Sequence, residues 1–422
     1  MRTLALPRSL VWGPVLCVLA TAPSISGEYL AGGDGSGTDN PDLLNGTANC
    51  SNCNVGPAPR EYDAPLFDID WALALRGGYV LSSTTGGSFA GTAVPTVVLT
   101  QEGLRSSFAL TATATLEQSQ LYGFRVPSAQ LSAAGEYELD AATRLTGAAN
   151  LSLSQDSPNP PTTLSQPQIL HGDAEVGVAH KVGDFEVGAR VNAGRTMYGE
   201  STLAGGVVVD NSWENNTSVG GGLRVAYPIT PTLTAFADGS AKYQYFDGPS
   251  PVVLAKLDGP TYIGRVGVAY DPSSILSAEA SVGYGLRRFD AGFADVGAVL
   301  YDASVIFRPD ETLTLNGGFS TEITPPSSSD IGLARVTYTA TAAAAYAVNP
   351  WLGLRASADW YWADVAGTAD YETGYHLKAG ADYLVNDNTR LTADYTYTRV
   401  DAPPPAVSRD SHKFEVGVTF SK

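Results

Sequence analysis

The sequence predicts an all-β protein, a closed antiparallel transmembrane β-barrel of about 16–18 strands with short periplasmic turns and longer extracellular loops. Three observations predict it: apolar side chains alternate with period two, a hairpin unit recurs about every forty residues, and tight connections alternate with long ones. After the first few dozen residues, no stretch reaches the roughly 18 apolar residues that a membrane helix needs. Strands must therefore make any membrane span.

The alternation begins at residue 66. In FDIDWALALRGGYVL the odd positions from Phe67 to Leu81 are mainly apolar, whereas Asp68, Asp70 and Arg76 fall on even positions. Successive side chains of a strand point to opposite faces, so this pattern indicates strands with one apolar face. The same pattern recurs in FEVGARVNAG, YIGRVGVAY, LSAEASVGYGL and the terminal KFEVGVTF.

The repeated unit is a hairpin whose turn follows an aromatic residue. The lead aromatics are Tyr137, Tyr227, Tyr270, Phe307, Tyr346 and Tyr383. Tight connections (DAAT, GD, TPT, DPSS, RPDE, VNP and NDN) alternate with longer polar ones, among them QDSPNPPTTLSQPQ, ESTLAGGVVVDNSWEN and ADVAGTADYE. A forty-residue repeat also suits a propeller, but a blade carries four strands, and two strands per repeat fit hairpins better.

Aromatic residues are placed at both ends of the predicted strands. Phe185 joins the lead aromatics beside the tight turns, whereas Tyr243, Tyr284 and Trp360 approach the longer loops. Two aromatic belts are typical of the two interfaces of a bilayer.

The N-terminal region predicts export. Residues 1–27 carry Arg2 and Arg8, an apolar run and small residues near Gly27, as a signal peptide does. Residues 28–65 lack periodicity and are predicted to be a flexible periplasmic tail, followed by the barrel over 66–422. In an exported chain, Cys50 and Cys53 favour a local disulfide. The net charge of −18 argues against nucleic acid as a partner.

The polar parity of the strands predicts the lining of the lumen. If the apolar parity meets lipid, the opposite one faces inward. The candidates for lining the pore are Arg76, Arg190, Arg224, Lys242, Arg265, Arg287, Arg335, Arg355, Lys378, Asp359, Asp382 and Glu415. Two interpretations remain open: a hydrated conduit with a field across it, and a self-paired network that keeps the wall rigid.

Catalytic and cofactor chemistry find no support in the sequence. The four histidines, His171, His180, His376 and His412, stand in no nucleophile or metal motif. We therefore expect no enzyme, no metal and no cofactor.

From WALALRGGY through YELDAATRLTG to the terminal KFEVGVTFSK, the chain resembles Gram-negative outer-membrane barrels of the putative beta-barrel porin 2 family. The resemblance implies a porin-like channel associated with exopolysaccharide export. Outer-membrane barrels commonly end on an aromatic residue, but here Phe420 is followed by Ser421 and Lys422.

Two functions follow as hypotheses. The first is an outer-membrane channel for passive passage or export of polar solutes, with exopolysaccharide as the cargo that the resemblance implies; its partners are outer-membrane lipid, the barrel-assembly machinery and the solute. The alternative is a structural or adhesive barrel whose lumen is plugged by the tail or by a loop such as 199–214.

Overall fold

A computed structural model describes residues 67–155, 163–203, 205–326, 332–368, 370–401 and 408–422. The expected signal peptide, the expected tail and the Cys50–Cys53 pair lie outside these residues. The strands of the main sheet are β1 (Asp68–Ser82), β2 (Gly86–Glu102), β3 (Ser106–Ser119), β4 (Gly123–Glu138), β5 (Thr143–Gln155), β7 (Gln168–Val182), β8 (Phe185–Tyr198), β11 (Asn216–Thr230), β12 (Leu233–Phe246), β13 (Gly259–Ser273), β14 (Leu276–Arg287), β15 (Val296–Phe307), β16 (Leu313–Thr324), β17 (Ala334–Asn349), β18 (Leu352–Ala366), β19 (Tyr371–Asn386), β20 (Thr389–Asp401) and β21 (Arg409–Ser421).

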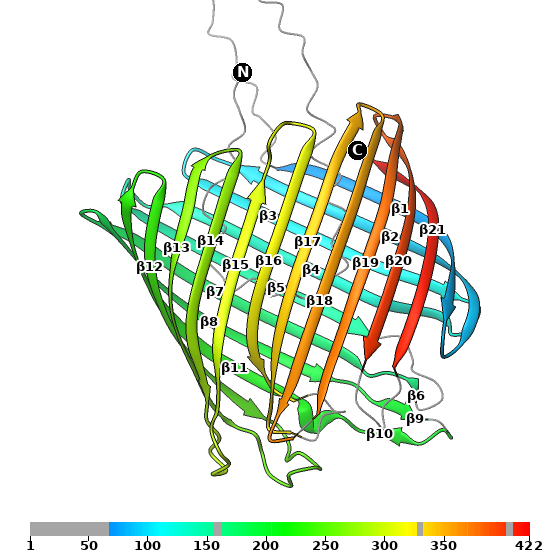
Figure 1. Ribbon diagram of the computed structural model, residues 1–422, viewed down its shortest axis with the longest axis horizontal. Helices are drawn as coiled ribbons and strands as arrows, with labels where there is room; N and C mark the ends of the chain where they lie inside the picture. The colour runs from blue at the N-terminus through cyan, green and yellow to red at the C-terminus, as the bar shows by residue number, and fades with distance from the viewer. Residues whose placement is uncertain (1–66, 156–162, 204, 327–331, 369, 402–407) are drawn as a thin grey trace, which may run out of the picture. The chain divides into compact units, whose positions relative to one another are not determined.

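These strands form one closed antiparallel sheet. Each strand pairs with the strand before and the strand after it, and the last closes on the first, from Ala72 opposite Ser421 to Ser82 opposite Ser411. The sheet has 18 strands, within the predicted range. Figure 1 shows them tilted side by side around the barrel. Closure gives every strand two neighbours, so the sheet has no edge strand of the kind that an open sheet has.

The two rims differ as the sequence predicts. On the short-turn rim, hairpins close through segments such as 183–184 between β7 and β8, and 387–388 between β19 and β20. Gly183 has φ 62°, a left-handed conformation that glycine adopts without steric cost. The long-loop rim carries segments 199–215, 247–258 and 288–295, and the sequence pattern does not predict the last of these.

Two further differences concern the long-loop rim. The connection expected at 363–372 is short, because β18 continues to Ala366 and β19 begins at Tyr371. The loop expected over 199–214 carries β9 (Ser201–Leu203), β10 (Val208–Val209) and the 3-10 turn η2 (Ser212–Glu214), and β9 also pairs with β6 (Thr163–Ser165). Periodicity does not reveal such short strands, because they hold too few residues.

The outer face is apolar, as the alternation predicts. The lead aromatics Tyr227, Tyr270, Tyr346 and Tyr383 are all exposed, as are valines such as Val176 and Val266 in mid-strand. In a soluble protein such a surface would be costly, whereas in lipid it costs nothing. Within the described residues no helix is long and apolar enough to cross a membrane.

The one apolar cluster among the described residues lies near the long-loop rim. It joins strands to loop residues and comprises Phe246, Leu257, Phe289, Leu300, Ile323, Ala334 and Val336. The rest of the barrel encloses polar side chains, which are the candidates for function.

Candidate pore lining

All twelve predicted lining residues lie on the strand parity opposite to the exposed apolar side chains; ten are half-buried, and Asp382 and Arg287 are buried. In β1, for example, Arg76 is half-buried while its neighbours Leu75 and Gly77 are exposed on the outer face. Arg287 differs, because its side chain is completely buried at 0% exposure. It lies inside the wall, so the expectation that it lines the pore is wrong.

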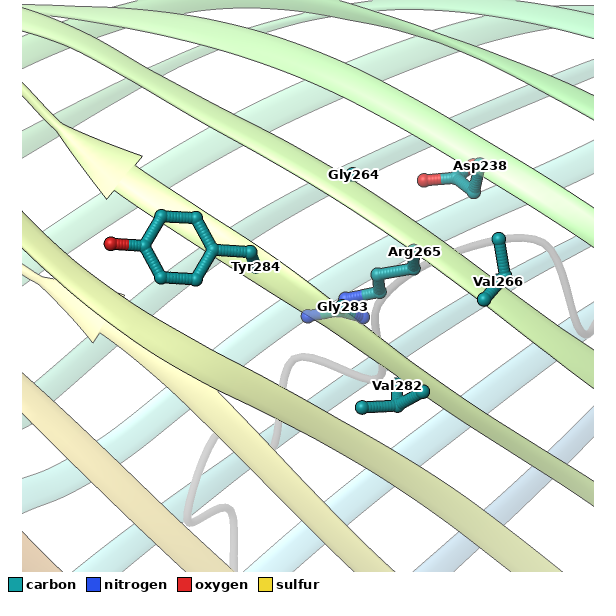
Figure 2. A pocket seen from close by; sticks show the side chains of 7 residues that line it. All are labelled: Asp238, Gly264, Arg265, Val266, Val282, Gly283 and Tyr284. Carbon is teal, nitrogen blue, oxygen red and sulfur yellow. The ribbon is translucent and has the colours of Figure 1, made fainter.

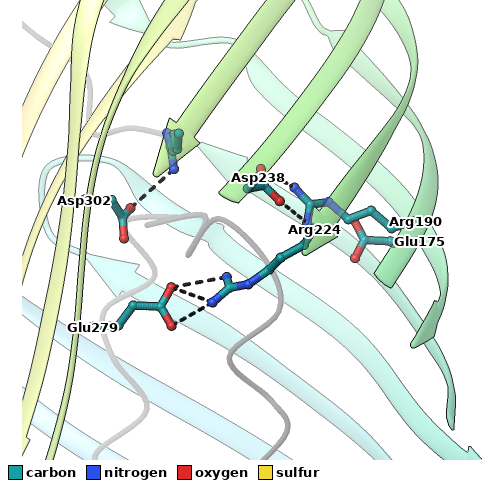
Figure 3. A network of polar contacts seen from close by, with 7 residues as sticks. Glu175, Arg190, Arg224, Asp238, Glu279 and Asp302 are labelled. Carbon is teal, nitrogen blue, oxygen red and sulfur yellow. Dashed lines mark hydrogen bonds and ion pairs between the residues drawn. The ribbon is translucent and has the colours of Figure 1, made fainter. Parts of the chain in front are cut away.

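The inner charges form a lateral network over β7 to β15. Arg190 of β8 donates through Nη1 and Nη2 to the two carboxylate oxygens of Asp238 on β12, at 3.1 and 3.2 Å, and its Nε lies 3.9 Å from Glu175. Figure 3 shows this pair reaching across β11. A guanidinium that meets a carboxylate with two parallel bonds is held in one geometry.

Arg224 of β11 extends the same network. Its Nη1 and Nη2 donate to Glu279 on β14 at 3.2 Å (Figure 3). Its guanidinium carbon lies 3.7 Å from the centre of the Phe236 ring. Arg265 of β13 lies 3.7 Å from Asp302 of β15. Each cation therefore crosses one or two strands along the wall to reach an acid.

A second network joins β18, β19, β20 and β1. Arg355 donates to Asp394 at 2.7 Å and lies 3.5 Å from Asp382, while Arg76 lies 3.8 Å from Asp394. The side chain of Asp394 is only 2% exposed. Beside them Lys413 pairs with Glu415 at 2.9 Å. The carboxylates are thus buried beneath the cations.

Glycines on neighbouring strands let these long side chains lie flat. A Cβ at Gly222 would stand 3.2 Å from the guanidinium of Arg190, and one at Gly380 would stand 2.3 Å from Asp394 Oδ1. Likewise, a Cβ at Gly417 would meet Arg76 Cγ at 2.6 Å. The glycines therefore provide the space in which the ion pairs lie against the wall.

The remaining predicted residues have different surroundings. Lys242 and Lys378 lie on the inner parity of β12 and β19 without a carboxylate within ion-pair distance among the described residues. Asp359 stands opposite His376 in the β18–β19 ladder. Arg335 pairs with Glu372 at 2.9 Å.

The wall over β2 to β7 carries neutral pairs beside the ion pairs Arg125–Glu117 and Arg144–Glu136. Thr113 donates to Thr96 at 3.3 Å, Ser128 donates to Thr115 at 3.0 Å, and Gln130 donates to Asn150 at 2.9 Å. This side of the wall therefore offers hydroxyl and amide groups in addition to charges.

A shallow hollow in the wall shows how thin the barrel is. Figure 2 shows Val282 and Tyr284 on β14, with Asp238 on β12 and Arg265 on β13. The two glycines here, Gly264 and Gly283, leave only backbone between the exposed and the inner side chains. The two charged residues at the hollow are already paired, Asp238 with Arg190 and Arg265 with Asp302, so we assign the hollow no ligand.

Sequence parity identified the basic residues better than their acidic partners. It missed Asp238, Glu279 and Glu372, although all three stand on the same inner parity as the basic residues. Parity is the only feature of the sequence that could have identified them, because each acid and its arginine are separated by 37–55 residues in the chain. Among the described residues, no group of His, Cys, Asp and Glu could hold a metal ion.

The closed wall and its charged inner face define a porin-like barrel. The chain belongs to the family described as putative beta-barrel porin 2, which it matches over residues 79–422. Comparison with curated proteins finds none that matches.

Several solved structures are similar in outline. OccK3 (OpdO) of Pseudomonas aeruginosa is 15% identical, with 84% of this chain and 96% of that chain covered and a TM-score of 0.41. OpdK of Pseudomonas aeruginosa, solved with vanillate, is 11% identical, with 84% of this chain and 99% of that chain covered and a TM-score of 0.42. OccAB4 of Acinetobacter baumannii is 12% identical, with 84% of this chain and 98% of that chain covered and a TM-score of 0.39. The fold rests on the strand pairing, and these similarities identify no solute.

Proposed function

We propose that the protein is a passive outer-membrane channel for polar solutes, with exopolysaccharide as one class of cargo. The observation that carries the proposal is the lateral arrangement of the inner charges, exemplified by Arg190 and Asp238 across β11. Side chains that pair along the wall leave the axis clear, whereas side chains that pair across the lumen would close it. The threonine, serine and amide groups over β2 to β7 suit solutes that carry hydroxyl groups.

The proposal includes the route to the membrane. The expected signal peptide at 1–27 would direct export, and the barrel-assembly machinery would insert the chain. The outer parity of β21, with Phe414, Val416 and Phe420 exposed, supports contact with lipid up to the end of the chain. The ion pairs among the inner charges favour a wall that these pairs hold rigid. The inner cations that lack a paired acid supply the electric field across the lumen.

Liposome swelling tests the function. Refolded protein in liposomes should admit neutral sugars at rates that fall with sugar size, and short acidic oligosaccharides should enter as well. A barrel proved folded by heat-modifiable migration but impermeable to the smallest sugar would contradict the proposal. Deletion of residues 28–65 separates the plugged alternative, because permeability that rises only after the deletion would identify the tail as a plug.

A further inference from the structure

Strands β15 and β16 pair along only half of their length. The ladder runs from Phe307 opposite Leu315 to Asp302 opposite Ser320 and then stops. Over the same stretch the other edge of β15 remains paired with β14 as far as Val296. At the point of separation, the backbone N–H of Tyr301 donates to the side-chain Oγ1 of Thr321 at 3.3 Å. The wall therefore parts here, toward the long-loop rim.

Beyond this point, β16 lies on the inner side of β14 and β15. Leu315 and Ile323 share the outer parity of β16, yet Leu315 is 37% exposed and Ile323 only 7%. A Cβ at Gly285, on the inner face of β14, would meet Ile323 Cδ1 at 2.8 Å and Leu300 Cδ1 at 3.0 Å. The outer face of β16 is thus packed on the inner face of β14 and β15, and the wall has two layers.

Apolar side chains hold the two layers together. Leu257 from segment 247–258 and Phe289 from segment 288–295 join Leu300, Ile323 and Val336 in the buried cluster. Removal of these large side chains from water stabilises the contact between the layers. Within the cluster Arg287 donates to Leu257 O at 3.1 Å and to Gln244 Oε1. The overlap is therefore a fixed packing of side chains rather than a loose end.

The overlap narrows the lumen. Eighteen strands that are spaced by about 4.8 Å and tilted by about 40° form a ring whose backbone diameter is roughly 35 Å. Two stacked sheet layers lie about 10 Å apart, so the inner layer takes a large share of the free width on this side. The face that it turns to the lumen carries Arg335 of β17, next to Tyr361 of β18 and Glu372 of β19.

These three side chains form a connected polar group. Nη2 of Arg335 and the hydroxyl of Tyr361 both donate to Oε1 of Glu372, each at 2.9 Å. The side chain of Arg335 is 18% exposed and that of Glu372 is 34% exposed. Both signs of charge therefore face the water at the narrowed level.

We propose that the overlap of β16–β17 on β14–β15 is the constriction of the channel, and that Arg335, Glu372 and Tyr361 form its charge filter for ionic solutes. The inference rests on the proposed channel function. A charge in a narrow, partly dehydrated passage acts on every passing ion, whereas the same charge on a wide wall is screened.

Spin labels test the overlap without reference to conduction. In a chain whose cysteines are replaced by serine, Ile323→Cys and Leu315→Cys each receive a nitroxide, and the refolded barrel is measured in lipid. We expect molecular oxygen, which concentrates in the bilayer, to relax the label at 315 strongly and the label at 323 weakly. Equal accessibility at the two positions would overturn the inference, whatever the protein conducts.

Reversal potentials test the filter. Arg125 is the matched control, because it also pairs with a glutamate near the long-loop rim, Glu117, but lies on β4 outside the overlap. In a salt gradient, Arg335→Glu should shift the cation-to-anion permeability ratio about threefold or more toward cations, and Arg125→Glu by less than half of that shift. Equal shifts would overturn the filter. Absence of any conductance in the wild type would instead overturn the channel function, while the spin labels still decide the overlap.

Discussion

Asp394 gives the sharpest test of the luminal network, because two arginines depend on it. Its carboxylate accepts from Arg355 at 2.7 Å, lies 3.8 Å from Arg76, and is 2% exposed. At an effective dielectric constant of about 20, such separations correspond to roughly 4–6 kcal/mol of attraction per pair, most of it offset by desolvation. Asp394→Asn keeps the shape and removes the charge that Arg76 and Arg355 share, so that Arg355 keeps only Asp382, at 3.5 Å. We expect the free energy of unfolding to fall by about 3 kcal/mol.

The measurement is urea unfolding of the refolded barrel in lipid vesicles, followed by tryptophan fluorescence. Asp302→Asn is the control, because that carboxylate is 30% exposed and 3.7 Å from Arg265. Water screens the pair of Asp302 with Arg265, so Asp302→Asn should lower the free energy of unfolding by about 1 kcal/mol or less. Asp394→Asn and Arg355→Gln should also couple by about 1.5 kcal/mol in a double-mutant cycle, whereas Asp394→Asn and Arg265→Gln should be additive. Equal costs for the two asparagine variants would refute the reasoning.

Three other predictions follow from the wall and its turns. Gly222→Leu should force the guanidinium of Arg190 off the wall and lower single-channel conductance. Gly239→Leu is the control, because a Cβ there would meet nothing within 4 Å, and it should leave conductance unchanged. Equal conductances of the two variants would show that the space at Gly222 has no effect. Gly183→Val, at φ 62°, should lower the free energy of unfolding by about 1–2 kcal/mol in the same urea assay, and no loss would contradict a strained turn. Hydrogen bonds from Thr312 hold the pKa of Asp310 below its usual 3.8 in the folded protein. The stability that this carboxylate adds is therefore present above pH 3.8 and is lost as the pH falls through the lower folded pKa. In urea unfolding at pH 7 and pH 3, the stability of Asp310→Asn should change less with acid than that of the wild type, and identical pH dependence would contradict this assignment.

The sequence predicted those parts of the fold that depend on local pattern. Period two placed Arg76 and Asp382 on the inner face, and the turn residues at 183–184 and 387–388 placed the short-turn rim. These predictions succeed because lipid, water and turn geometry act on each hairpin separately. The same locality explains the good estimate of strand number.

Features that depend on distant strands could not be predicted in this way. Arg287 follows the inner parity, but segment 247–258 folds over it and Leu257 O accepts its hydrogen bond. Ile323 follows the outer parity, but this part of β16 lies on the inner side of β14 and β15, so the side chain of Ile323 is buried. Alternation reports which side of a strand a residue occupies, and it contains no information on what is packed against that side.

Single-channel recording of the refolded chain in a planar bilayer tests the central claim most directly. A water-filled lumen lined by laterally paired charges predicts discrete conductance steps that rise linearly with voltage and with salt concentration. A chain that is shown by heat-modifiable migration to be folded and inserted, yet gives no steps in wild type or after deletion of residues 28–65, would contradict it.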